Sequence, residues 1–190
     1  CCKMGGHFIG TSYDGTKVFR ALENKTQGEG IRIMSGENKM WEITKQYTND
    51  TFENNESCLG YTIDVYQESI NKVFPEYLVN YDYFIELLEQ YGFALLTSVE
   101  CQEIGLTKSI GNFDLLFNEM QKMVKSRQIR KTDIGTAANM NSDEKKISFL
   151  NKYFIFKKIR DVNAEEIEKN QLNTTKTNQV IVSEKKKRRF

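Results

Sequence analysis

The segment Phe74–Val79 (FPEYLV) has the residue types that best fit a chemical role in this chain. Glu76 places an acceptor-only carboxylate in an otherwise apolar stretch, directly after Pro75, the only proline of the chain. The same spacing also fits a purely structural interpretation. Proline suits the first turn of a helix, and a following glutamate complements the helix dipole. We therefore expect Pro75 to begin a helical element, with Glu76 in its first turn.

Other reactive side chains are few and widely spaced. The four cysteines form no Cys-x-x-Cys pair, and the single histidine, His7, lies in a short apolar run. This pattern argues against a zinc site and a disulfide framework, favours a reducing compartment, and predicts that His7 is a strand residue. Gly28-Glu29-Gly30 is followed by a strand-like alternation and not by a helix, which excludes a nucleotide-binding loop there.

Hydrophobic patterning places these residues on alternating strands and helices. The apolar face of one helix is formed by Phe84, Leu87, Leu88 and Tyr91, at helical spacing, and Gly92 ends that helix. The turn at residues 35–38 favours a hairpin between its two flanking strands. The remaining expected helices are 16–24, capped by Asp14 or Thr16, and 112–124. The expected strands are 7–11, 31–34, 40–43, 61–65, 93–99 and 149–159.

The charge distribution limits where RNA could bind. The net charge is +1, but Lys185–Arg189 holds five of the 27 basic residues, and the rest of the chain has a balance of −4. A mildly acidic body gives no general attraction for nucleic acid, so any RNA recognition must be local. The segment 165–190 is polar and rich in Asn, Thr and Lys, which predicts a disordered basic tail. No apolar run approaches the ~20 residues of a membrane span.

Three motifs resemble the mRNA cap guanine-N7 methyltransferases. Gly5–Asp14 (GGHFIGTSYD) is similar to the strand and turn that begin the second half of that catalytic domain. Leu59-Gly60-Tyr61 and the later Pro-Glu-Tyr-Leu-Val resemble the family's Phe-Gly-x-x-Tyr strand and Pro-Glu motif, with Leu59 where phenylalanine is usual. Glu144–Lys158 resembles the closing strand of the large-DNA-virus branch. The resemblance extends from Cys2 to about Ala164.

The resemblance implies an α/β fold. We expect residues 1–164 to form the C-terminal half of a class I S-adenosylmethionine-dependent methyltransferase, a Rossmann-like sandwich with an inserted antiparallel hairpin. In that fold the last strand runs antiparallel beside its predecessor. The Gly-rich loop that holds S-adenosyl-L-methionine in this class has no counterpart in the sequence. The cofactor site is therefore expected mostly upstream of Cys1, and the fragment alone is expected to be inactive.

The resemblance also implies roles for three residues. The glutamate matching Glu76 binds the cap guanine, because a carboxylate accepts from both N1–H and the exocyclic amine; such a contact contributes roughly 1–3 kcal/mol of discrimination. Tyr13 matches a proline that lines the cap pocket in many members, although an ordinary turn tyrosine fits the sequence as well. A cap-contacting tyrosine of the closing strand aligns with Asn151, and of the two nearest candidates we favour Tyr153. No catalytic residue is expected, since N7 is already nucleophilic and catalysis is by orientation.

The expected partners follow from the same resemblance. They are the capped 5′ end of mRNA, the N-terminal half of the same domain and, in multifunctional capping enzymes, further domains or subunits, but no membrane. The expected location is the host cytoplasm or the virion for a viral protein and the nucleus for a cellular one. Two alternatives stay open: a non-catalytic methyltransferase-like subunit of a capping complex, and a methyltransferase for another substrate.

Overall fold

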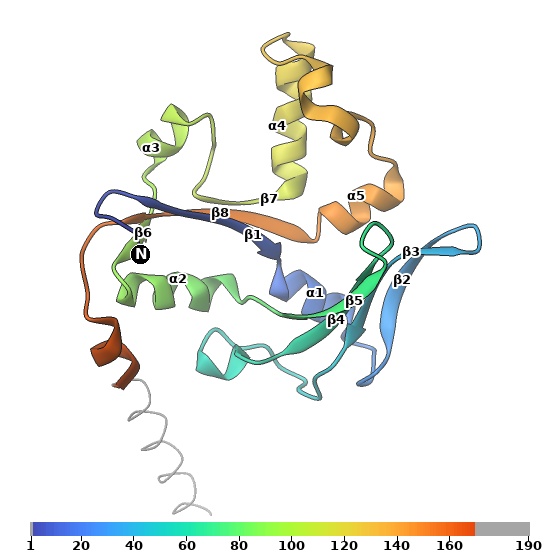
Figure 1. The fold of residues 1–190 in the computed structure, drawn as a ribbon, viewed down its shortest axis with the longest axis horizontal. Helices are drawn as coiled ribbons and strands as arrows, with labels where there is room; N and C mark the ends of the chain where they lie inside the picture. Colours follow the sequence, from blue (N-terminus) through green and yellow to red (C-terminus); the bar gives the residue numbers. More distant parts are fainter. Residues whose placement is uncertain (1, 170–190) are drawn as a thin grey trace, which may run out of the picture.

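The computed structural model describes residues 2–169, which contain two four-stranded sheets. In the first sheet, β8 (Asn151–Lys158) pairs along one edge with β1 (His7–Tyr13). Along its other edge β8 pairs with β6 (Phe93–Leu95) and β7 (Ile110–Asn112). All these pairings are antiparallel, so β8 is the one reversed strand of this sheet (Figure 1). The predicted α/β class and the reversed last strand are confirmed.

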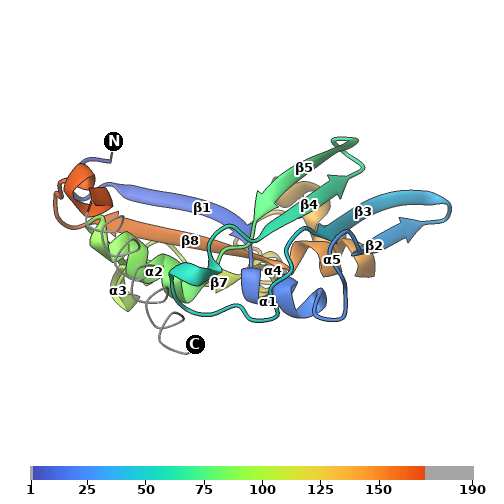
Figure 2. The same ribbon diagram turned by 90° about the horizontal axis from the view of Figure 1, so that it is seen from below.

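The second sheet is an antiparallel meander of β2 (Gly30–Ser35), β3 (Asn38–Lys45), β4 (Thr62–Gln67) and β5 (Lys72–Tyr77). The predicted hairpin is correct, but it forms half of a larger sheet. Figure 2 shows this sheet bending away from the layer of β1 and β8. Its inner face packs on the chain around the end of β1, and β5 is one of its two edge strands.

The expectation that Pro75 opens a helix is wrong. Pro75 and Glu76 lie inside β5, where their Cα partners on β4 are Asp64 and Ile63. The helix α2 (Tyr81–Gln90) begins only after Asn80, whose side chain accepts from two backbone N–H groups of the first turn. An edge strand tolerates proline because it pairs on one side only, so one missing N–H leaves the ladder intact. Glu76 is therefore a strand residue and not the first turn of a helix.

Helices cover the first sheet unevenly. α1 (Gly15–Ala21) follows β1 directly and is capped by the predicted Asp14, whose carboxylate accepts from Lys17 N–H. α2 packs Phe84 and Leu88 under the β8 phenylalanines Phe154 and Phe156 (Figure 1). α4 (Phe113–Lys125) forms as expected and stands beside β7.

Several segments differ from the expected elements. The strand expected at 93–99 ends at residue 95, because Thr97 caps α3 (Ser98–Glu103) and forms a capping box with Glu100. Between α4 and β8, where no helix is expected from the sequence, lie the 3-10 segment η2 (Lys131–Asn139) and the helix α5 (Ser142–Ser148). A short 3-10 turn, η1 (Glu56–Cys58), precedes β4. Residues 164–169 are helical, and the predicted tail beyond them, with its basic run, lies outside the described residues.

The core is divided between the two sheets. The largest cluster joins Val18 of α1 and Leu22, which caps that helix, to the inner face of the second sheet, through residues such as Ile43 and Ile63. A second cluster fills the space between α2 and β8. Among residues 2–169, no helix has the length and apolar character needed to cross a bilayer.

Candidate functional site

Tyr13, the last residue of β1, packs its side chain against the inner face of the second sheet. It is buried, and its hydroxyl accepts a 3.1 Å hydrogen bond from the indole Nε1 of Trp41. The Gln67 side chain acts on the same hydroxyl and lowers its pKa. Burial raises the pKa of Tyr13, and the nearby carboxylate of Glu76 raises it further. The structure therefore brings Tyr13 and Glu76, two of the three predicted site residues, into electrostatic contact.

Glu76 lies on the same face of β5 as the sheet's buried residues. Its Cα partner on β4 is the fully buried Ile63, and the neighbouring inner-face position of β4 is Val65. The carboxyl group is half-buried, and desolvation raises the pKa of Glu76. Within residues 2–169 this carboxylate takes part in no hydrogen bond or ion pair. A partly desolvated acceptor without donors is costly, which makes Glu76 a group that a ligand with paired N–H donors would satisfy.

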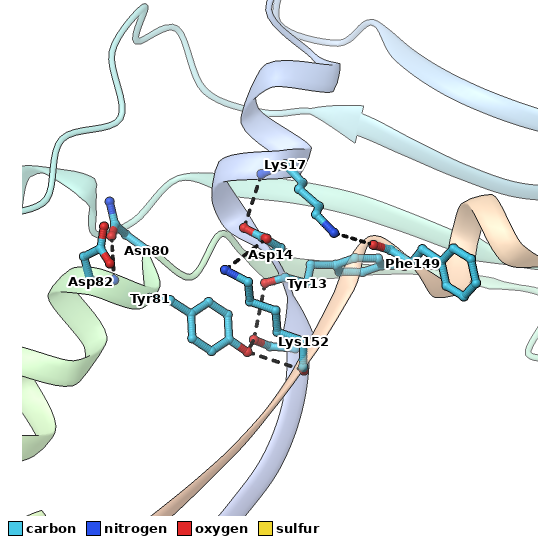
Figure 3. Close-up of polar contacts among 9 residues, drawn as sticks. Tyr13, Asp14, Lys17, Asn80, Tyr81, Asp82, Phe149 and Lys152 are labelled. Carbon is cyan, nitrogen blue, oxygen red and sulfur yellow. Dashed lines mark hydrogen bonds and ion pairs between the residues drawn. The ribbon is translucent and has the colours of Figure 1, made fainter. Parts of the chain in front are cut away.

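A buried ion pair fixes the end of β1 behind Tyr13. Asp14 is 4% exposed, and its carboxylate lies 3.1 Å from the Nζ of Lys152 on β8 (Figure 3). That ammonium lies 4.9 Å from the ring centroid of Tyr81, whose hydroxyl is 2.9 Å from Ser12 Oγ. These contacts connect β1, β8 and the first turn of α2. Three elements therefore hold the backbone in place at the end of β1, where Tyr13 lies.

Backbone contacts connect the same point to the segment after β5. Asp14 and Val79 form an isolated parallel bridge, and the N–H of Gly15 donates to the Val79 carbonyl at 3.0 Å. A Cβ on Gly15 would collide with the Val79 backbone, so this approach requires glycine. Because Val79 follows Glu76 by three residues, the bridge holds the carboxylate-bearing strand close to the end of β1.

Tyr153 has a different environment. Its hydroxyl donates to the Lys108 carbonyl at 3.1 Å, and its ring covers Gly111, where any Cβ would meet ring atoms. Within residues 2–169, no side-chain hydrogen bond or ring contact joins Tyr153 to Glu76 or Tyr13. Asn151, the alternative on this strand, is the Cα partner of Tyr13, but its amide donates to two carbonyls of α5. The structure thus places Tyr153 apart from the other two predicted residues.

Trp41 and Gln67 are site residues that the sequence interpretation missed. The alternation of residues 40–43 indicated only that Trp41 and Ile43 share a face. Nothing in the sequence showed that this face would meet the end of β1. Among residues 2–169, no group of three or more His, Cys, Asp or Glu side chains could hold a metal ion. The side chains gathered at this site, Tyr13, Trp41 and Glu76, offer hydrogen bonding and ring contact.

Comparison with known proteins identifies a family that this chain resembles. A family model described as the mRNA (guanine-N(7))-methyltransferase domain matches residues 1–159. A search of curated proteins found no match.

Proposed function

The chain belongs to the mRNA (guanine-N7)-methyltransferase family, and from this premise we propose that it supplies the cap-binding half of an enzyme that methylates N7 of the cap guanine. The observation that carries the proposal is the half-buried Glu76 carboxylate, which has no hydrogen bond among the described residues and whose charge raises the pKa of Tyr13. Guanine presents an N1–H and an exocyclic amine side by side, and one carboxylate accepts from both.

This arrangement suits a reaction that needs no general base. N7 of guanine carries a free lone pair, so methyl transfer depends on holding N7, the methyl carbon and the sulfur of S-adenosyl-L-methionine in line. Glu76 would fix the Watson–Crick edge of the base, which lies opposite N7. Tyr13, held by Trp41, would form one wall of the pocket. We retain Tyr153 as a cap contact only as a hypothesis, since its hydroxyl is bonded to Lys108.

The cofactor itself does not fit the residues described. Among residues 2–169, no glycine-rich loop joins a strand to a helix in the way that cradles a nucleotide-like cofactor. We therefore assign this chain the role of substrate binding, and we propose that S-adenosyl-L-methionine is held mostly by the part of the domain expected before Cys1. The position of β1 supports this assignment, because among residues 2–169 it pairs with β8 alone and its other edge could pair with a further strand.

A methyl-transfer assay tests the proposal directly. The full-length polypeptide is incubated with radiolabelled S-adenosyl-L-methionine and RNA carrying a GpppA end, an ApppA end or a triphosphate end. We expect label only on the GpppA RNA, at N7 of the cap guanine. Equal labelling of the ApppA RNA, or labelling of protein instead, would indicate the alternative of another substrate. Cofactor binding without any transfer would indicate a non-catalytic subunit.

Glu76→Gln should stabilise the folded protein while reducing its cap methylation. Since desolvation raises the pKa of Glu76, the folded state binds this proton more tightly than the unfolded chain does. Stability is therefore lost as the pH rises from the ordinary glutamate range through the raised pKa. Removing the charge should raise the unfolding free energy at neutral pH by less than ~1 kcal/mol, because the carboxyl group is partly solvated and its charge is screened.

Thermal unfolding at several pH values measures this effect. The gain should disappear in acid, where wild-type Glu76 is already protonated, and cap methylation should fall. Replacing the exposed Glu68 of the β4–β5 turn by glutamine is the matched control and should leave the unfolding midpoint unchanged. An unchanged or lower midpoint for Glu76→Gln at neutral pH would show that the carboxylate is not destabilised by its surroundings.

A further inference from the structure

The edge strand β5 presents three different side-chain chemistries on one face. Residues two apart on a strand point to the same side, so Lys72 and Phe74 share the inner face with Glu76. The register agrees, because Phe74 pairs with the buried inner-face Val65, and Lys72 pairs with Gln67. In order along the strand, this face therefore carries an ammonium, an aromatic ring and a carboxylate.

Neither of the two added side chains is used by the fold. Phe74 is 43% exposed and, among the described residues, stacks on no other ring and joins no core cluster. Lys72 is exposed and makes no ion pair within residues 2–169. Both side chains are therefore available for contact with a ligand on this face.

Tyr13 shows that this face borders the candidate site. Its hydroxyl accepts from the indole of Trp41, the cross-strand partner of Gln67, and the charge of Glu76 raises its pKa. Gln67 is the cross-strand neighbour of Lys72, and Glu76 lies four residues from Lys72 on the same strand. Tyr13 therefore packs on the part of the inner face that ends at β5. There the edge is formed by Lys72, Phe74 and Glu76.

We propose that Lys72 and Phe74 extend the guanine site into a strip that binds the remainder of the cap, the Phe74 ring packing on the guanosine and the Lys72 ammonium contacting the triphosphate bridge. This inference rests on the proposed role of Glu76. Alternate strand residues lie about 6.6–6.8 Å apart, so the three side chains are spaced like successive parts of a nucleotide. The sequence of chemistries also matches: acceptor for the base edge, apolar ring for the nucleoside, cation for the phosphates.

Equilibrium binding of three ligands separates the two roles. Guanosine, GMP and the dinucleotide cap GpppA are titrated into the full-length polypeptide and its variants. Phe74→Ala should weaken all three by about tenfold, the lower range for loss of a base–aromatic contact. Lys72→Ala should leave guanosine binding unchanged, weaken GpppA binding several-fold, and lower the slope of log affinity against log salt by about 1.

Two controls on the same molecule match these variants. Tyr77→Leu removes an aromatic side chain, 65% exposed, from the opposite face of the same strand. Lys125→Ala removes an exposed lysine at the end of α4. Both should bind like wild type, and thermal midpoints verify that every variant is folded. Wild-type GpppA binding by both Phe74→Ala and Lys72→Ala would contradict the proposed strip. So would a loss of guanosine binding in Lys72→Ala equal to its loss of GpppA binding. If wild type binds none of the ligands, the proposed function fails, and this inference fails with it.

Discussion

Glu76→Ala should remove most cap methylation while leaving the fold intact. The variant deletes the acceptor for both N–H donors of the guanine edge, and a bidentate contact of this kind is worth about 1–3 kcal/mol, or roughly five- to 150-fold. We expect a loss of that size in kcat/KM for GpppA-capped RNA in the full-length polypeptide. Because the carboxylate makes no hydrogen bond or ion pair within residues 2–169, its removal takes away no described contact of the folded state.

The controls distinguish recognition from damage to the sheet. Asp64→Ala removes a carboxylate from the outer face of the adjacent strand, where Asp64 accepts from the Gln46 side chain at 2.7 Å. That variant should retain near-normal methylation. Circular dichroism and the unfolding midpoint show whether Glu76→Ala is folded. Near-wild-type turnover by a folded Glu76→Ala variant would show that Glu76 does not bind the cap guanine.

Asp14→Ala should be the most destabilising single change near the site. It removes the cap of α1 and leaves the Lys152 ammonium, whose side chain is 23% exposed, without its partner. Breaking a buried pair from one side typically costs about 3–5 kcal/mol. Ordinary domains have an unfolding free energy of only about 5–15 kcal/mol. This variant should therefore lose a large part of its unfolding free energy, as measured by urea denaturation.

A double-mutant cycle checks the cause of that loss. Asp14→Asn keeps an acceptor for the Lys17 N–H but not the charge, so it should cost less than Asp14→Ala. Lys152→Ala added to Asp14→Ala should recover part of the stability, because the unpaired ammonium is removed as well. If the two single losses simply add, the pair contributes nothing, and the end of β1 is held by its backbone contacts alone.

The parts of the fold that were predictable from sequence are those with local signals. The helical spacing around Phe84, the Asp14 cap and the hairpin turn each depend on neighbouring residues, and all three are present. Gly92 also ends α2 as expected, because its φ of +81° is a conformation that favours glycine. The reversed final strand followed from the family resemblance and not from periodicity.

The errors come from tertiary pairing. Pro75 and Glu76 satisfy the local rule for a helix start, but pairing with β4 holds them in a strand. α5 was missed because its seven residues are almost wholly polar, and its stability comes from the Asn141 capping box. The proximity of Tyr13 to Trp41 depends on how the two sheets meet, which no local pattern contains. Tyr153 as a cap contact follows from the family resemblance and stays a prediction; the resemblance does not reveal that its hydroxyl donates to the Lys108 carbonyl.

The most direct measurement is a crystal structure of the full-length polypeptide with a GpppA cap bound. The account predicts that the two carboxylate oxygens of Glu76 lie about 2.7–3.1 Å from the guanine N1 and exocyclic nitrogen. It also predicts that Tyr13 keeps its bond from Trp41 and borders the base. A guanine bound elsewhere, with the Glu76 carboxylate contacting only water, would contradict the central claim.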